Sequence, residues 1–200
     1  MATISSNDTA KNNAVDALKI NGRVAVLMGG NAAEREVSLA SGNAVIASLT
    51  SMGVDVVAID TAGDVIADLQ AAKPNFAFIA LHGKGGEDGT MQALLEKMNI
   101  PYSGSRVLGS ALAMDKVRSK NIWRGLSLPT PAFACLDATS DFDAVLTTLG
   151  GTAFVKPADE GSSIGMSLVK TAEELQEAYL STAESGVTIF AEQWIDGPEY

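Results

Sequence analysis

Lys156 ends a short apolar run, and a loop of small residues with two glycines and two serines follows it at 157–165. Because small side chains leave the backbone amides unobstructed, several amides of such a loop can point at one phosphate, and a neighbouring lysine adds positive charge. The lysine precedes the glycines, so the segment is neither a GxxxxGK[ST] loop nor a GxGxxG turn. This order indicates a flexible lid over a nucleotide; the structural alternative is an ordinary hairpin turn beside an exposed lysine.

Two further segments combine glycines with charged residues. Residues 29–38 join an apolar run to a helical pattern and carry Glu34 and Glu36. These acids either interact with the helix dipole, which favours them by roughly 0.3–1 kcal/mol, or present a carboxylate to a substrate ammonium. Residues 82–89 hold four glycines among His, Lys, Glu and Asp. A helix cap by Asp88 explains only one of these residues, so the backbone freedom of the segment indicates a functional loop.

The second half of the chain offers partners for a nucleotide. Residues 115–125 look helical and are rich in lysine and arginine, which form either a solvated charged face or a source of charge for phosphates. A group of acidic and apolar residues follows the last apolar run: Glu192, Trp194, Ile195 and Glu199. They are either an edge-strand acid, a core indole and a turn carboxylate, or an adenine slot with one carboxylate for the amino group and another for the ribose.

The elements that must position these residues follow from the hydrophobic pattern. Apolar runs at 23–28, 54–59 and 76–81 predict strands, and helical spacing predicts helices at 37–49 and 65–72 between them. Strands that are apolar throughout and separated by helices indicate a parallel sheet covered on both faces. In such sheets ligands gather beyond the carboxyl ends of the strands, and the two glycine-containing loops of the first half fall there.

A second unit is expected from about residue 114. Its predicted strands are at 132–136, 153–156, 167–169 and 187–194, and its predicted helices at 115–125, 141–149 and 172–183. We expect 167–169 to pair with the preceding strand as a hairpin. These elements are too few to close a layered core, and the chain stops at Tyr200 directly after a strand, so we expect a fragment. Residues 1–21 are polar and predict a poorly ordered extension.

Composition excludes several classes of protein. A formal net charge of −10 argues against a nucleic-acid surface, which needs clustered Lys and Arg. One cysteine, Cys135, excludes an internal disulfide and fits a reducing cytoplasm, and one histidine, His82, excludes a His-rich metal site. No apolar run approaches the ~20 residues that span a bilayer, so we expect no membrane partner.

Taken in order, these motifs closely resemble the D-alanine–D-alanine ligase family of the ATP-grasp superfamily. The resemblance covers 22–200 and rests on several long segments: 24–30 (VAVLMGG), 33–38 (AEREVS), 80–89 (ALHGKGGEDG), 101–105 (PYSGS), 110–116 (SALAMDK) and the 155–165 loop. It implies an α/β fold, with a parallel-sheet N-terminal (pre-ATP-grasp) domain at 22–113 that binds substrate. An incomplete α+β ATP-grasp domain at 114–200 follows.

The resemblance also implies a reaction. ATP phosphorylates the carboxylate of one D-alanine, and the amine of a second attacks the acyl phosphate, which gives D-alanyl-D-alanine, ADP and phosphate for peptidoglycan precursors. A closing lid would exclude water, which hydrolyses the acyl phosphate. Mg²⁺ (or Mn²⁺) would assist, with its ligands beyond Tyr200, so we expect no metal ligand and no activity in the 200-residue chain alone. A cytoplasmic homodimer is implied as well.

Residue roles are carried over by motif. Glu34 would bind the ammonium of the first D-alanine, Ser162 would join it in a hydrogen-bonded relay, and His82 would lie near the substrate carboxylate. The resemblance assigns the remaining matched residues to the nucleotide: Lys116, Lys156 and Ser163 at the phosphates, Glu192, Trp194 and the Ile195 backbone at the adenine, and Glu199 at the ribose.

Three alternatives stay open to different degrees. The segments around Glu34 and His82 argue against another ATP-grasp carboxylate–amine ligase, because they belong to the D-alanine ligase pattern. The sequence does not distinguish a variant that makes D-alanyl-D-lactate or D-alanyl-D-serine from an enzyme that makes D-alanyl-D-alanine, since the discriminating residues are expected outside the chain. A non-catalytic nucleotide-binding fragment is the third alternative.

Overall fold

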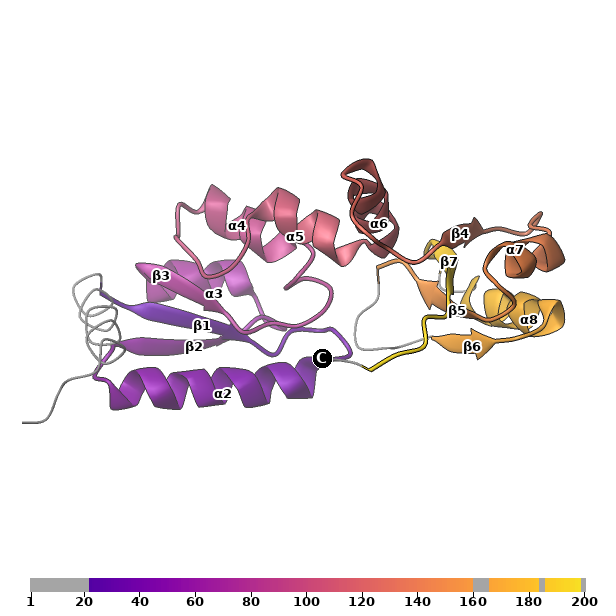
Figure 1. Cartoon of the computed structure of the whole chain (residues 1–200). Coiled ribbons are helices and arrows are strands. Elements are labelled where there is room, and N and C mark those ends of the chain that lie inside the picture. The colour runs from indigo at the N-terminus through magenta and orange to yellow at the C-terminus, as the bar shows by residue number, and fades with distance from the viewer. Residues whose placement is uncertain (1–21, 160–165, 184–185, 199–200) are drawn as a thin grey trace, which may run out of the picture. The chain divides into compact units, whose positions relative to one another are not determined.

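The computed structural model describes residues 22–159, 166–183 and 186–198, and the chain divides into two compact units, Met1–Ser110 and Ala111–Tyr200 (Figure 1). The domain boundary expected between 113 and 114 falls, like this division, within helix α5 (Val107–Met114), and it stays a prediction. The extension expected at 1–21 lies outside the described residues. Each unit has a sheet and a core and is described by itself.

The first unit is built on a three-stranded parallel sheet. Strand β1 (Val24–Met28) lies between β2 (Val56–Asp60) and β3 (Phe76–Ile79), and both neighbours run parallel to it. The carboxyl ends of all three strands therefore meet at one edge. The loops after β1 and β3, which carry Glu34 and His82, begin at this edge, as the sequence predicts.

Helix α2 (Arg35–Ser51) covers one face of this sheet (Figure 1). It approaches β1 so closely that a Cβ added at Gly42 would lie 2.5 Å from the Met28 sulfur. Successive side chains of a strand point to opposite faces, so Leu27 faces away from α2. A helix can come this close only because glycine has no side chain.

The opposite face holds the main core of the unit. Helices α3 (Val65–Ala72) and α4 (Thr90–Lys97) contribute Leu69 and Leu95, which are fully buried in one cluster with Leu27. The parallel sheet covered on both faces is thereby confirmed. The bounds of α3 are those that the sequence predicts, whereas α4 and α5 lie in a segment where the pattern predicts no element.

The second unit contains a four-stranded antiparallel sheet. Strand β7 (Ile189–Gln193) pairs with β4 (Phe133–Leu136) on one side and with β5 (Ala153–Pro157) on the other, and β6 (Ser167–Val169) lies at the edge. The expected hairpin between β5 and β6 is confirmed by their antiparallel pairing, with Ala153 opposite Val169.

Two helices, α7 (Phe142–Thr148) and α8 (Ala172–Ala183), pack against the buried side chains of this sheet. The core includes Val155 and Leu175, neither of which has exposed surface. Within the described ranges, no helix of either unit is long and apolar enough to cross a membrane.

The other face of the second sheet carries aromatic and charged side chains. Phe154 is opposite Glu192 and Lys156 is opposite Phe190 in the β5–β7 register, and directly opposite residues of an antiparallel pair share a face. These residues alternate with the buried Val155 and its neighbours, so they lie away from α7 and α8. Helix α6 (Lys116–Gly125) contributes side chains on this side of the sheet.

Candidate active site

Glu34 stands beyond the end of β1 as the N-cap residue of α2. Among the described residues its side chain makes no capping hydrogen bond to the helix, so capping does not account for this glutamate. Gly83, in the loop after β3, lies against its carboxylate: a Cβ at Gly83 would be 2.6 Å from Glu34 Oε2. The structure therefore brings the two acidic, glycine-containing loops of the first unit together.

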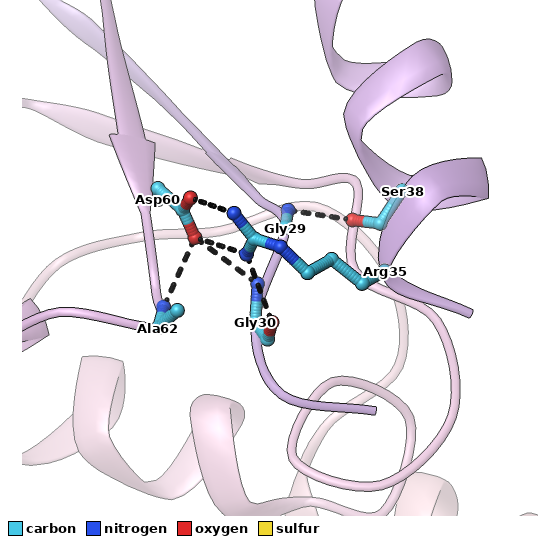
Figure 2. A network of polar contacts seen from close by, with 6 residues as sticks. All are labelled: Gly29, Gly30, Arg35, Ser38, Asp60 and Ala62. Atoms are coloured by element: carbon cyan, nitrogen blue, oxygen red, sulfur yellow. Dashed lines mark hydrogen bonds and ion pairs between the residues drawn. The ribbon is translucent and has the colours of Figure 1, made fainter. Parts of the chain in front are cut away.

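Arg35, the residue after Glu34, is bonded to the end of β2 and to the turn after β1 (Figure 2). Its Nη1 and Nη2 donate to Oδ1 and Oδ2 of Asp60 at 2.8 and 2.6 Å, a bidentate pair, and Nη1 also donates to the Gly30 carbonyl at 2.9 Å. Asp60 Oδ1 accepts from the backbone N–H groups of Gly30 and Ala62 at 3.2 and 3.0 Å. The Arg35 guanidinium and the Ala62 N–H hold the pKa of Asp60 well below its usual range.

Ser38 ties α2 to the strand ends from the inside. Its fully buried hydroxyl accepts from the Gly29 N–H at 2.9 Å and donates to the Ala80 carbonyl at 2.8 Å. Gly29 directly follows β1 and Ala80 directly follows β3. One side chain thus connects the starts of the two loops that carry Glu34 and His82.

His82 is held at the start of its loop by two neighbours. Its Nε2 lies 3.5 Å from Ser41 Oγ, and its Nδ1 lies 3.8 Å from Glu87 Oε1. The other oxygen of Glu87 accepts from the Gly83 N–H at 2.9 Å, which closes the loop on itself. The His82 side chain is partly exposed.

On the aromatic and charged face of the second sheet, Glu192 lies between two lysines. Lys156 donates to Oε2 at 2.5 Å, and Lys120 bonds to Oε1 and donates to Thr130 Oγ1 at 2.7 Å. Burial of Glu192 by itself raises its pKa, but the hydrogen bonds from Lys120 and Lys156 outweigh this effect and lower the pKa. Glu192 is therefore an ionised carboxylate with a fixed orientation.

A cavity of about 460 Å³ adjoins this carboxylate. Residues of α5, α6 and β7 line it, together with the segment before β4: Leu112, Ala113, Lys116, Ser119, Lys120, Ile122, Trp123, Thr130, Pro131, Phe190 and Glu192. The Lys116 N–H donates to the Ala158 carbonyl at 2.8 Å, which fixes the start of α6 at the end of β5. Mostly apolar walls with a few converging charged groups are typical of a small-molecule site.

The remaining candidates follow β7. Trp194 packs edge-on against Phe154 with ring centroids 5.1 Å apart, and Ile195 is exposed. Ser162, Ser163 and Glu199 lie outside the described residues, so the expected lid and ribose carboxylate stay predictions. Within the described ranges, no group of three or more His, Cys, Asp and Glu side chains could hold a metal ion.

Two residues of these sites have no place in the sequence predictions. Lys120 lies on the basic helix, for which the sequence allows either a solvated charged face or a source of charge for phosphates. The solvated face is wrong for Lys120, whose side chain is only 4% exposed. The side chain of Arg118, on the same helix, is 71% exposed and agrees with a solvated face. The spacing of Lys116 and Lys120, four residues apart, is the signal that places both on one helix face. Asp60 has no comparable signal.

Known proteins resemble both halves of the chain. Residues 63–105 match the family described as D-ala D-ala ligase N-terminus, and residues 122–200 match the D-ala D-ala ligase C-terminus. A D-alanine–D-alanine ligase from Pseudomonas putida (strain GB-1) is 56% identical over 183 residues, which are 92% of this chain and 58% of the relative. One from Marinobacter nauticus is 51% identical over 179 residues, 90% of this chain and 55% of the relative. The chain thus spans less than two thirds of the length of these curated relatives.

Solved structures agree with this assignment. A D-alanine–D-alanine ligase from Bacillus anthracis superposes with a TM-score of 0.79 at 39% identity, over 88% of this chain and 58% of that one. A structure of a D-alanine–D-alanine ligase from the same organism complexed with ATP gives 0.76 at 38% identity, over 88% and 60%. The parallel sheet followed by an antiparallel one is the α/β architecture of ATP-grasp ligases. The chain belongs to the D-alanine–D-alanine ligase family.

Proposed function

We propose that the chain carries the D-alanine-binding and ATP-binding parts of an enzyme that joins two D-alanines. ATP phosphorylates the carboxylate of one D-alanine, and the amine of the second displaces phosphate from the acyl phosphate, which gives D-alanyl-D-alanine, ADP and phosphate. The observation that carries the proposal is the Glu34 carboxylate, held against Gly83 where β1 and β3 end, in a chain of this family.

In this proposal, residues 22–113 bind the first D-alanine. Glu34 is its ammonium partner, because a carboxylate at the sheet edge offsets the charge of an amine that leaves water. Arg35 is engaged with Asp60 in a bidentate pair, so its charge is not directed at Glu34. His82, on the neighbouring loop, is the partner of the substrate carboxylate in this proposal.

Residues 114–200 bind ATP in this proposal. Lys116 and Lys156 supply charge to the phosphates, and Glu192 accepts a hydrogen bond from the adenine amino group. Trp194 and the Ile195 backbone border the base. By family resemblance Ser163 closes over the phosphates, Ser162 joins the Glu34 relay and Glu199 holds the ribose. A relative of known structure has been solved with ATP, which supports this part.

The metal, the assembly and the compartment belong to the same proposal. Mg²⁺ would neutralise phosphate charge in this reaction, but the described residues offer no group of side chains to hold it. A homodimer formed through the first domain, in the cytoplasm, is what the family resemblance implies.

The test measures ADP and D-alanyl-D-alanine formation by the complete gene product that contains this chain, with D-alanine, D-lactate and D-serine compared as second substrate. We expect both products together with D-alanine, and their loss in Glu34→Gln. The matched control is Glu36→Gln, an exposed acid in the first turn of α2, which should retain activity. ATP consumption only with D-lactate or D-serine would assign that compound as the second substrate. A folded but inactive wild type would contradict the proposal.

A further inference from the structure

We propose that Lys120 is a positioning residue that holds the Glu192 carboxylate in place for the nucleotide base while Lys156 turns to the phosphates. The inference rests on the proposed function, because it concerns the site to which ATP is assigned there. It adds a residue that the family resemblance does not assign, and it separates the roles of two lysines that bond to the same carboxylate.

The two lysines of this cluster differ in how firmly they are held. The Lys120 side chain is 4% exposed, and besides Glu192 it contacts Thr130 Oγ1 at 2.7 Å and the Phe133 ring, whose centroid is 5.1 Å from Nζ. The Lys156 side chain is 19% exposed, pairs with Glu192 and has its Nζ over the Phe154 ring, 5.4 Å from the centroid. Lys120 is therefore the inner partner and Lys156 the outer one.

Burial decides which lysine can leave. A buried ammonium without a partner carries a large desolvation penalty, so Lys120 stays on Glu192 as long as the fold is intact. Lys156 is nearer to water and loses less when it exchanges the carboxylate for another anion. A nucleotide phosphate is such an anion, and Lys156 directly precedes the segment expected to close over phosphates.

The departure of Lys156 leaves Glu192 with one fixed oxygen and one available oxygen. The available oxygen is Oε2, on the side of Lys156 and the Phe154 ring, against which Trp194 packs, so it can meet a base that Trp194 borders. An ionised carboxylate only accepts hydrogen bonds. It therefore favours the amino group of adenine and repels the carbonyl oxygen that guanine has at the same ring position. Without Lys120, Glu192 would remain paired with Lys156, and this discrimination would be lost.

The experiment measures the Kd values of ATP and GTP by calorimetry on the complete gene product. We expect Lys120→Met to weaken ATP binding about tenfold or more and to bring the ATP/GTP ratio close to one. Lys156→Met is the control, and it should weaken ATP and GTP by a similar factor, because both carry the same phosphates. Lys120→Arg keeps the charge and should retain most of the preference for ATP.

Further variants separate positioning from folding. In the Glu192→Gln background, Lys120→Met should leave the ATP/GTP ratio unchanged, because Lys120 acts through Glu192. If Lys120→Met does not fold, Thr130→Val, which removes only the second hydrogen bond of Lys120, should lower the ratio by a smaller factor. A folded Lys120→Met with the wild-type ratio would overturn the inference. A wild type that binds neither nucleotide would overturn the proposed function as well.

Discussion

Gly83 and Gly85 lie in the same loop and differ in what surrounds them. Both have a left-handed backbone, with φ of +67° and +85°, so alanine at either position costs about 1–2 kcal/mol of stability. Only at Gly83 would the new Cβ meet a side chain, Glu34 Oε2 at 2.6 Å; at Gly85 it would meet no described atom within 4 Å. The pair separates backbone strain from displacement of the glutamate.

We therefore expect Gly83→Ala to raise the KM for D-alanine about tenfold or more, because a misplaced binding group loses its alignment with substrate. Gly85→Ala should share the loss of stability but keep a KM within about threefold of wild type. Steady-state kinetics and thermal unfolding of both variants test this. Equal KM values in the two variants would contradict a role for the contact between Gly83 and Glu34.

At the residue scale the sequence predicts types and loops but not long-range partners. Glu34 and His82 are recognised because charged residues stand among glycines at the ends of apolar runs. Asp60 is not recognised, because its partner Arg35 is 25 residues away and only the pairing of β1 with β2 brings them together. Lys120 is missed because most basic residues on a helix are solvated, and only the packing of α6 buries it.

At the scale of elements, Asp60 joins three segments: the end of β2, the turn after β1 and the first residue of α2 (Figure 2). Its folded-state pKa is lowered, first of all by the hydrogen bond from Arg35. A carboxyl with a lowered pKa contributes its stability above the pKa of the unfolded chain, about 4, and loses it as the pH falls further. The contribution should therefore be present at neutral pH and fade in acid.

We expect Asp60→Asn to lower the free energy of unfolding at pH 7 by about 1 kcal/mol, a modest value because the pair is partly exposed. Between pH 5 and about 3 the wild type should lose more stability than the variant. Urea unfolding at each pH measures both. The control is Asp55→Asn, an exposed carboxylate that accepts from Arg23 Nε at 3.0 Å, and it should change little. A variant as acid-sensitive as wild type would sink the prediction.

The pattern of elements shows what periodicity can and cannot predict. Helix α8 has the predicted bounds, since its apolar residues repeat at helical spacing between polar ones. Helix α4 follows Gly89, which has a φ of +91° and offers no side-chain cap, and α5 is apolar almost throughout and contains Gly109. Helix α5 therefore lacks the amphipathic stripe that marks a helix in a sequence, whereas α4 has one, with Met91 and Leu95 buried four residues apart after the candidate cap Asp88, and the prediction missed it.

At the scale of the whole molecule, the described residues form two separate apolar clusters. Leu95 belongs to the cluster of the first unit and Leu175 to that of the second, and neither has exposed surface. Replacing either leucine by alanine removes buried contacts and leaves a cavity, which costs about 2–5 kcal/mol. We expect each cavity to lower hydrogen-exchange protection in its own sheet: β1 and β3 for Leu95→Ala, β5 and β7 for Leu175→Ala.

Ligands sharpen this comparison, because a ligand stabilises the part of a protein that binds it. At 100 times its Kd a ligand adds about 2.7 kcal/mol, which is within the range of one such cavity. If the two functions are divided as proposed, ATP should restore protection of β5 and β7 in Leu175→Ala, and D-alanine should restore β1 and β3 in Leu95→Ala. Peptide-resolved mass spectrometry measures this. Equal loss in both sheets for each variant, restored by either ligand, would mean that the chain unfolds as one cooperative body.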